Sequence, residues 1–249
     1  MGTIPALVDA FDGTNNATAT TSNTGADSIT GTASLATFTT TVGEFQTGTA
    51  ALEVQVPTTS VADTVILRYD FTAAGLVYLD LYVQVPTVPS TSTMIVNWFS
   101  GSTKVGDVRV VPGSGVFQFQ GRDVSTARWS SQTLPTGWYR LAVKIDPGST
   151  TGHQIRIFSG AGIDSTVPSI DSGTYTAAGS GATTIDNVRL GFISAAIGTV
   201  RFDSLTADDA DWPTRSAPPG AVTPVPVKVR EASAWTTATL KHRSGGAWV

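Results

Sequence analysis

The amino-acid sequence predicts an all-β protein, and three observations support this fold class. Segment after segment shows the alternation of apolar and polar residues that is typical of a strand with one buried face. Clusters of Gly, Pro, Ser, Thr and Asp separate these segments and supply turn geometries. No stretch of a dozen residues carries a helical period, whereas threonine and valine, which strands favour, are abundant. At 249 residues the chain can bury a core without disulfides or metals, and it contains no cysteine.

The predicted elements follow one another along the chain. Residues 15–34 are polar, small and low in complexity, so we expect a long loop or an irregular edge strand there. Each strand after them is predicted from apolar residues at every second position. These inward residues are Leu52, Val54 and Val56; Val65, Leu67, Tyr69 and Phe71; Val77, Leu79, Leu81, Val83 and Val85; Met94, Val96 and Trp98; Tyr139, Leu141, Val143 and Ile145; Ile155 and Ile157; Val188, Leu190 and Phe192; Val200 and Phe202.

A proline-rich stretch, TRSAPPGAVTPVPV, separates a long body from a short terminal segment. Proline holds a chain extended and denies it the hydrogen bonds of a sheet, so we interpret residues 214–226 as a linker. The predicted organisation is a β domain at residues 1–213, the linker, and a terminal module at residues 227–249.

The terminal module contains one short phrase twice. Lys228, Arg230, Ala234 and Trp235 recur thirteen residues later as Lys241, Arg243, Ala247 and Trp248. Each copy is typical of a short strand, a turn and a resumed strand, and so small a sheet is only marginally stable alone in water. Tryptophan and arginine are enriched at interface hot spots, and strand addition to a neighbour's edge is a common docking mode.

We therefore predict that both copies dock on another protein. The predicted docking residues are Lys228, Arg230, Trp235, Lys241, Arg243 and Trp248. The alternative is a tail that folds back onto its own body.

Charge is unevenly distributed along the chain. Residues 1–213 contain ten basic and eighteen acidic residues, whereas residues 214–249 contain five basic residues and one acidic residue. Duplex binding depends on a large basic surface, so the acidic body argues against nucleic acid as a partner. No apolar run approaches the roughly 18 residues of a membrane span, and the opening MGTIPALVDAFDG lacks the features of a secretion signal. We expect no membrane partner and folding in a reducing cytoplasm.

Several longer phrases resemble a known family. ALVDAFDG, GTAALEVQV, LPTGWYRLAVKID, HQIRIFSG and NVRLGFISAAIGTVRFDSLTADDADWP follow one another as in the laminin-G-like (concanavalin A-like) jelly-roll module. More narrowly, residues 4–213 are similar to the version carried by minor tail proteins of bacteriophages that infect actinobacteria. VKVREASAW and KHRSGGAWV also look like a terminal motif of phage tail proteins.

This resemblance implies a jelly-roll sandwich of two antiparallel sheets. It also implies a structural protein of the virion, often located at the tail tip and often suspected of binding cell-surface carbohydrate. A homotrimer is implied by analogy with tail proteins.

Jelly rolls of this class include glucanases, so catalysis has to be considered. A glycosidase needs two carboxyl groups across the sugar, which the glucanase branch usually supplies from a Glu-x-Asp-x-Glu strand. The glutamates here are Glu44, Glu53 and Glu231, and none has this spacing. There is no Gly-x-Ser-x-Gly elbow, and we place His153 in a polar turn and His242 in the tail. We therefore predict that the protein is not an enzyme.

One strand carries the residues of a candidate glycan face. Opposite the buried residues of LVYLDLYVQV stand Tyr78, Asp80, Tyr82 and Gln84, so alternation places two aromatic rings and two polar groups on one side. Sugars stack on aromatic rings, and their hydroxyls bind carboxylates and amides. The predicted glycan-binding residues are Tyr78, Asp80, Tyr82, Gln84, Trp138 and Arg140.

Basic residues extend this predicted face. Lys144, Arg156, Arg189 and Arg201 hold equivalent outward positions on other strands, where they would line the same surface. The alternative is a face that is solvated or packed against neighbouring subunits. We interpret Trp98, Trp129 and Trp212 as core or loop anchors.

Calcium is a further candidate ligand, because members of the family often place an ion near the first and last strands. Asp9 and Asp12 stand at the first strand and Asp203 at the last, and calcium requires such hard oxygen ligands. The alternative is that these aspartates, together with Asp208, Asp209 and Asp211, occupy turns and keep the surface soluble. No other cofactor is expected.

The sequence therefore predicts a non-enzymatic virion protein, a minor tail protein at the tail tip that contributes to host attachment through surface glycan. Its other partners would be virion proteins bound by the terminal module. The alternative is an architectural or decorating protein, on tail or capsid, that contacts virion proteins alone.

Overall fold

The computed structural model describes residue 11 and residues 13–43, 46, 49–57, 64–192, 196–213, 227–231, 234–238, 243–244 and 247–248. The chain divides into two units, residues 1–215 and 216–249, and each is described by itself.

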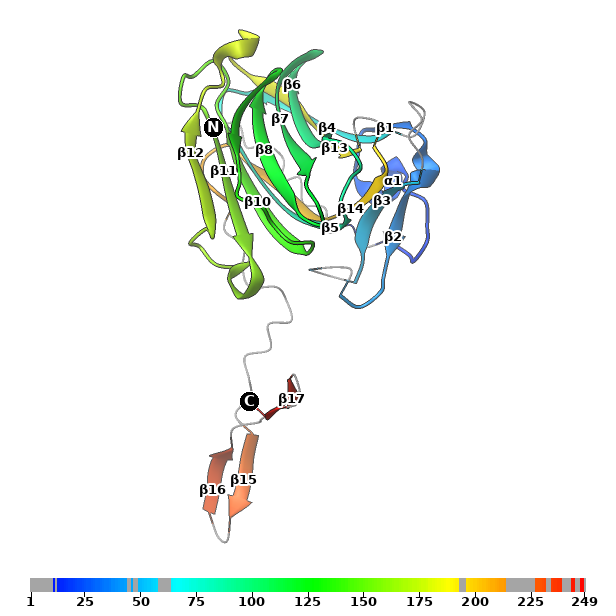
Figure 1. Cartoon of the computed structure of the whole chain (residues 1–249), viewed down its shortest axis with the longest axis vertical. Coiled ribbons are helices and arrows are strands. Elements are labelled where there is room, and N and C mark those ends of the chain that lie inside the picture. Colours follow the sequence, from blue (N-terminus) through cyan, green and yellow to red (C-terminus); the bar gives the residue numbers. More distant parts are fainter. Residues whose placement is uncertain are drawn as a thin grey trace. The chain divides into compact units, whose positions relative to one another are not determined.

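The first unit is a jelly-roll sandwich of two antiparallel sheets, which confirms the predicted fold class (Figure 1). Sheet 1 has seven strands in the order β1-β4-β13-β6-β7-β8-β9. Their bounds, in that order, are Ser28–Gly31, Val65–Ala74, Ile185–Phe192, Thr93–Ser100, Thr103–Pro112, Phe117–Asp123 and Thr126–Ser130. Sheet 2 has seven strands in the order β12-β11-β10-β5-β14-β3-β2. Their bounds are Ile170–Tyr175, His153–Ser159, Trp138–Ile145, Val77–Thr87, Gly198–Asp208, Ala51–Val56 and Ala36–Thr39.

Helix is scarce in the described part of the chain. The short α1 (Thr21–Thr24) lies in the polar N-terminal segment, and three single turns of 3-10 helix are η1 (Ala33–Leu35), η2 (Gly160–Gly162) and η3 (Ala178–Ser180). In the same polar segment, β1 is an edge strand paired with β4. Of the two expectations for residues 15–34, a long loop or an irregular edge strand, the second therefore holds for β1. No helix of the described residues is long and apolar enough to cross a membrane.

The core lies between the two sheets and consists of the residues that the alternation places inward. The predicted inward residues of β5, β10, β11 and β13 are all buried. Two predicted inward residues, Phe71 and Met94, are only half-buried, because the ladders beside them contain irregularities that interrupt the alternation. The central Trp98 is completely buried and is the largest such side chain described.

Several strands lie where the sequence analysis predicted none, namely β2, β7, β8, β9 and β12. In β7 the inward position next to Trp98 is occupied by Gly106, and a Cβ there would lie 2.7 Å from the indole. A glycine inside a strand weakens the apolar pattern, although here it makes room for the largest ring in the core. The apolar alternation of β7 is therefore interrupted at Gly106, because the Trp98 ring leaves no room for a side chain there.

His153 is an ionisable group inside this core, and its placement in a polar turn was wrong. It begins β11, is completely buried and touches Trp98 and Tyr175 edge-on, with ring centroids 5.3 and 5.6 Å away. Burial lowers the pKa of His153 to about 3, although the backbone of Val105 opposes the shift. No ring nitrogen makes a hydrogen bond of normal geometry within the described chain. The imidazole is therefore neutral in the folded protein.

The terminal unit contains two small antiparallel hairpins, each described from its backbone alone. The first pairs β15 (Val227–Glu231) with β16 (Ala234–Ala238), and the second pairs β17 (Arg243–Ser244) with β18 (Ala247–Trp248). Arg230 is registered opposite Trp235 and Arg243 opposite Trp248, so both copies of the repeat have the same pairing. Lys241 lies outside the described residues.

His153 should make the fold sensitive to acid. An unfolded chain protonates this histidine below pH 6.5, whereas the folded chain resists protonation to about pH 3, so its contribution to stability is complete above pH 6.5 and is lost as the pH falls between these values. We expect His153→Phe to remove on the order of 3 kcal/mol of pH dependence between pH 7 and pH 4. Urea unfolding of both proteins at the two pH values measures this difference. Parallel loss of stability in wild type and variant would contradict it.

Candidate functional site

The outward face of β5 is where the predicted glycan residues meet residues of its two neighbours. In the β5–β10 ladder, Asp80 lies opposite Ala142, Tyr82 opposite Arg140 and Gln84 opposite Trp138. Alternation places these residues on one side of sheet 2, away from the buried Leu79, Leu81 and Val83. The structure therefore brings all six predicted residues onto one face.

Asp80 and Arg140 form the charged centre of this face. Their side chains make an ion pair with 3.4 Å between Arg140 Nε and Asp80 Oδ2, and the two residues are only 1% and 5% exposed. Arg140 also donates from Nη2 to the carbonyl of Ser165 at 2.9 Å, and its Cζ lies 3.7 Å above the ring of Phe158. A buried charge is tolerated when it is paired and hydrogen-bonded in this way. The guanidinium is consequently held in one orientation.

The segment between β11 and β12 covers part of the predicted glycan face. Tyr82 is 1% exposed and its hydroxyl donates to a carboxylate oxygen of Asp164. The Arg140 bond to Ser165 fastens the same segment. Asp80, Tyr82 and Arg140 are therefore buried, because a loop that periodicity does not describe folds over them.

Trp212 joins the site, although the sequence analysis assigned it an anchoring role. Its ring lies 4.9 Å from that of Tyr78, and the Cζ of Arg156 lies 4.2 Å from the indole. Arg156 in turn pairs with Asp171 on β12, at 3.3 Å. Burial, followed by the charge of Asp211, raises the pKa of Tyr78, so its phenol stays protonated at neutral pH. Only the fold shows that Trp212, near the end of the β domain, packs against Tyr78 of β5.

Together these residues enclose a cleft of about 230 Å³. Its lining comes from β5, β10 and β11, from the covering segment and from the end of the body. The lining residues are Asp80, Arg140, Ala142, Arg156, Phe158, Asp164, Ser165, Thr166, Asp211, Trp212 and Pro213. A concave site with an indole and several fixed polar groups is the usual form of a small-molecule or sugar site.

The remaining predicted residues lie beside this cleft. Trp138 borders a separate, more open hollow of about 530 Å³, and its indole N–H donates to the carbonyl of Gly43 at 3.1 Å. Gln84 accepts a hydrogen bond from Arg201 at 2.8 Å, and Arg201 also binds Glu53. These contacts hold Gln84 within a polar network of sheet 2 rather than in the cleft.

Arg189 does not belong to this face, and its grouping with the other outward basic residues was wrong. Lys144, Arg156 and Arg201 lie on β10, β11 and β14 of sheet 2, whereas Arg189 lies on β13 of sheet 1. Periodicity assigns a residue to one side of its strand and carries no information on which sheet the strand joins.

Of the three aspartates predicted to bind calcium, the structure describes Asp203. Asp203 is completely buried on β14, and its carboxylate accepts the backbone N–H of Gln46 at 2.8 Å. Asp9 and Asp12 lie outside the described residues. Asp208 ends β14, and its carboxylate accepts the backbone N–H groups of Ala210 and Asp211 in the bend that follows the strand. In the part of the chain that the structure describes, no three His, Asp or Glu side chains gather as a metal site.

No protein-family model and no curated protein matches this sequence. Among solved structures, the chain is similar in fold to a marine alginate lyase from Aplysia kurodai, with a TM-score of 0.52, 9% identity, and coverage of 83% of this chain and 99% of that one. It is also similar to a carbohydrate esterase from the Shiga toxin-encoding bacteriophage phi24B (0.49, 12% identity, 74% and 90% coverage). A third is the CBM2 module of an evolved Dit protein from Lactobacillus casei BL23 phage J-1 (0.43, 15% identity, 84% and 97% coverage). At 9% identity, the likeness to the alginate lyase shows the fold alone.

The bond between Tyr82 and Asp164 should hold the covering segment in place. We expect Tyr82→Phe to cost about 1–2 kcal/mol of stability, since the half-buried carboxylate of Asp164 loses its donor. Amide hydrogen exchange in residues 163–166 should accelerate. Tyr69→Phe is the matched control, because it removes a buried hydroxyl that donates to Thr24 elsewhere in the sandwich. If residues 163–166 exchange equally fast in wild type and Tyr82→Phe, the bond does not hold the segment.

Proposed function

We propose that this protein is a non-enzymatic component of a phage virion that binds a glycan of the host surface in the cleft beside Trp212. The position we propose is a minor tail protein at or near the tail tip. The glycan part of the proposal depends on the geometry of the cleft. The virion part depends on the resemblance of residues 4–213, and of the doubled terminal phrase, to modules of phage tail proteins.

The observation that carries the proposal is the joint placement of an indole and fixed polar groups in one cleft. Trp212 is half-buried and supported by Tyr78 and Arg156, so a ring face at this position is preorganised for stacking against a sugar. Arg140 and Asp80 are buried and fixed by their ion pair, while the exposed Thr166 and Asp211 of the lining supply polar groups for the hydroxyl groups of a sugar. Preorganised groups lose little entropy when a ligand binds.

The charge of the cleft favours a neutral sugar. Its two arginines are paired with Asp80 and Asp171, and its lining also contains Asp164 and Asp211. An anionic ligand would have to compete with these carboxylates. We therefore propose an uncharged segment of a surface polysaccharide as the ligand of this site.

A non-enzymatic role is supported by the state of the carboxylates in the cleft. Asp80 is ion-paired with Arg140, and Asp164 accepts the Tyr82 hydroxyl, so both are committed to structural contacts. A glycosidase needs one protonated and one ionised carboxyl group facing the sugar. Release of reducing sugar from a bound polysaccharide by the purified protein would overturn this part of the proposal.

The second candidate is an architectural protein that contacts only other virion proteins. The two terminal hairpins favour it. In each hairpin an arginine is paired with a tryptophan across the strands, and two such units suit repeated docking on protein. In both proposals the terminal module binds the virion, through Lys228, Arg230, Trp235, Lys241, Arg243 and Trp248. Calcium bound through Asp9, Asp12 and Asp203, and assembly as a trimer, stay predictions.

Trp212→Ala tests the glycan site. We expect about a tenfold or greater loss of affinity for host cell-wall polysaccharide, equivalent to about 1.4 kcal/mol or more, because the stacking surface is removed. Adsorption of the purified chain to cell walls, followed by a glycan array, measures this loss. The array also identifies which neutral sugars bind.

Trp129→Ala is the matched control for this experiment. Trp129 is also a half-buried tryptophan, but it lies on β9 of sheet 1. Its replacement should leave adsorption within about twofold of wild type. If wild type does not adsorb, or if both variants adsorb as well as wild type, the architectural function is the better account.

Deletion of residues 222–249 separates docking from glycan binding. The truncated protein should fold and adsorb to cell walls like the full chain, because the sandwich is a compact unit of its own. It should fail to enter phage particles in a complementation assay. Normal incorporation of the truncated protein would show that the terminal module is not the docking element.

A further inference from the structure

The outward face of sheet 1 carries a row of polar residues that the proposed glycan site does not use. Arg68 lies opposite Arg189, which lies opposite Asn97, which lies opposite Asp107. Arg68 and Arg189 point away from the core, because their neighbours in sequence, among them Leu67 and Leu190, are buried in it. Four adjacent strands therefore present one continuous polar row.

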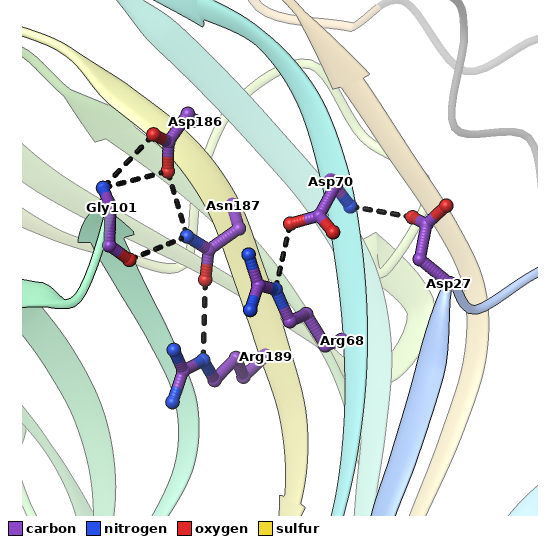
Figure 2. Close-up of polar contacts among 7 residues, drawn as sticks. All are labelled: Asp27, Arg68, Asp70, Gly101, Asp186, Asn187 and Arg189. Atoms are coloured by element: carbon purple, nitrogen blue, oxygen red, sulfur yellow. Dashed lines mark hydrogen bonds and ion pairs between the residues drawn. The ribbon is translucent and has the colours of Figure 1, made fainter.

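Arg68 and Arg189 form a like-charged pair directly across two strands. Figure 2 shows their guanidinium groups next to one another on the same side of β4 and β13. Burial, and then the charge of Arg68, lowers the pKa of Arg189. Like charges directly opposite one another in a sheet are destabilising. A chain that keeps such a pair retains a cost that an anion between the two groups would remove.

Arg189 is held in place without a carboxylate partner. Its Cζ lies 3.7 Å above the ring of Phe99, and its Nε donates to the side-chain oxygen of Asn187 at 3.2 Å. Asn187 is fixed in turn by bonds to the Gly101 carbonyl at 3.2 Å and to Asp186 at 2.7 Å (Figure 2). Among the described residues, the two terminal nitrogens of Arg189 have no hydrogen-bond partner. They form a fixed and vacant donor pair.

The acidic groups around this pair are already engaged. Asp70 pairs with Arg68 at 2.7 Å, and the carboxylate of Asp27 accepts the backbone N–H of Asp70, also at 2.7 Å (Figure 2). Asp186 accepts the backbone N–H of Gly101. Arg68 binds Asp70 through Nε alone within the described chain, so its terminal nitrogens also stay available. Solvent weakens this exposed ion pair, which an incoming anion can therefore share.

Asn97 adds a buried polar atom beside Arg189. The residue is 2% exposed, and its side-chain oxygen has no hydrogen-bond partner in the described part of the molecule. The next residue in the row, Asp107, is bound by both Lys104 and Arg109. Its charge is therefore matched by its own cations and does not neutralise the arginine pair. The Asn97 oxygen accepts hydrogen bonds and cannot bind an anion, so a ligand that completes the site has to bring a donor, such as a sugar hydroxyl, beside its anionic group.

We propose that Arg68 and Arg189 bind an anionic group, a carboxylate or a phosphate, carried by a polysaccharide. Planar guanidinium groups match the oxygens of either group with parallel hydrogen bonds. The body has a net charge of −8, from ten basic and eighteen acidic residues, and repels an anionic polymer at long range, so retention depends on this local pair. The site lies on sheet 1 and is separate from the cleft on sheet 2. The protein would then recognise two features of a surface polymer, neutral sugar and anionic substituent.

Affinity measurements on the full chain test this proposal. The probes are polygalacturonate for carboxylate, poly(glycerol phosphate) for phosphate, and dextran as a neutral polymer, each at low and at physiological salt. We expect wild type to bind at least one of the anionic polymers and Arg189→Gln and Arg68→Gln each to reduce that affinity about tenfold. The polymer that binds identifies the anionic group. Both variants should melt within about 2 °C of wild type, as is usual for surface positions.

Arg128→Gln is the matched control for net charge. Arg128 also lies on sheet 1, but it is paired with Asp123 at 3.2 Å, so its replacement removes the same charge from a satisfied group. We expect less than a twofold change in affinity for this variant. Equal losses in all three variants would show nonspecific attraction and overturn the site. Unchanged binding in Arg189→Gln, or no binding of either anionic polymer by folded wild type, would also overturn it.

Discussion

The rest of the structure depends on the burial of one face of each sheet against the other. Leu79, Leu81 and Val83 of β5 occupy the core, and because side chains alternate, Asp80 and Tyr82 must face outward. A slip of one residue in the register would place these polar groups between the sheets. The apolar core therefore determines where every outward side chain lies, including those of the candidate site.

The two outward faces of the sandwich differ in the sign of the charges that lie next to one another. On sheet 2, Asp80 and Arg140 are buried together and each compensates the other. On sheet 1, Arg68 and Arg189 lie opposite each other with the same sign. A buried pair of opposite charges tolerates the loss of water because its partner replaces the solvent. Of the two arginines on sheet 1, Arg68 has the exposed Asp70 as its partner, whereas Arg189 has no carboxylate partner among the described residues. The same physical argument therefore assigns a structural role to the buried pair and supports an external ligand for Arg68 and Arg189.

The covering segment and the end of the body give the candidate glycan site its shape. Residues 163–166 are attached by Tyr82 and Arg140, and Trp212 is attached by Tyr78 and Arg156. In both cases a residue on a rigid strand positions a group on an irregular segment. Binding sites are commonly built in this way, because the scaffold supplies precision while loops supply the side chains.

The amino-acid sequence by itself determined the fold class, most of the core and the repeat in the terminal module, because these follow from periodicity and local composition. It also determined that Tyr78, Asp80, Tyr82 and Gln84 share one side of a strand. Only the tertiary structure decided that Tyr82 is covered, that Trp212 returns to β5, and that Arg189 lies on the opposite sheet from Arg140. Alternation describes the two sides of one strand. Contacts between residues far apart in the chain decide which strands become neighbours and which loop closes over them. The pattern of apolar residues within one strand does not contain this information.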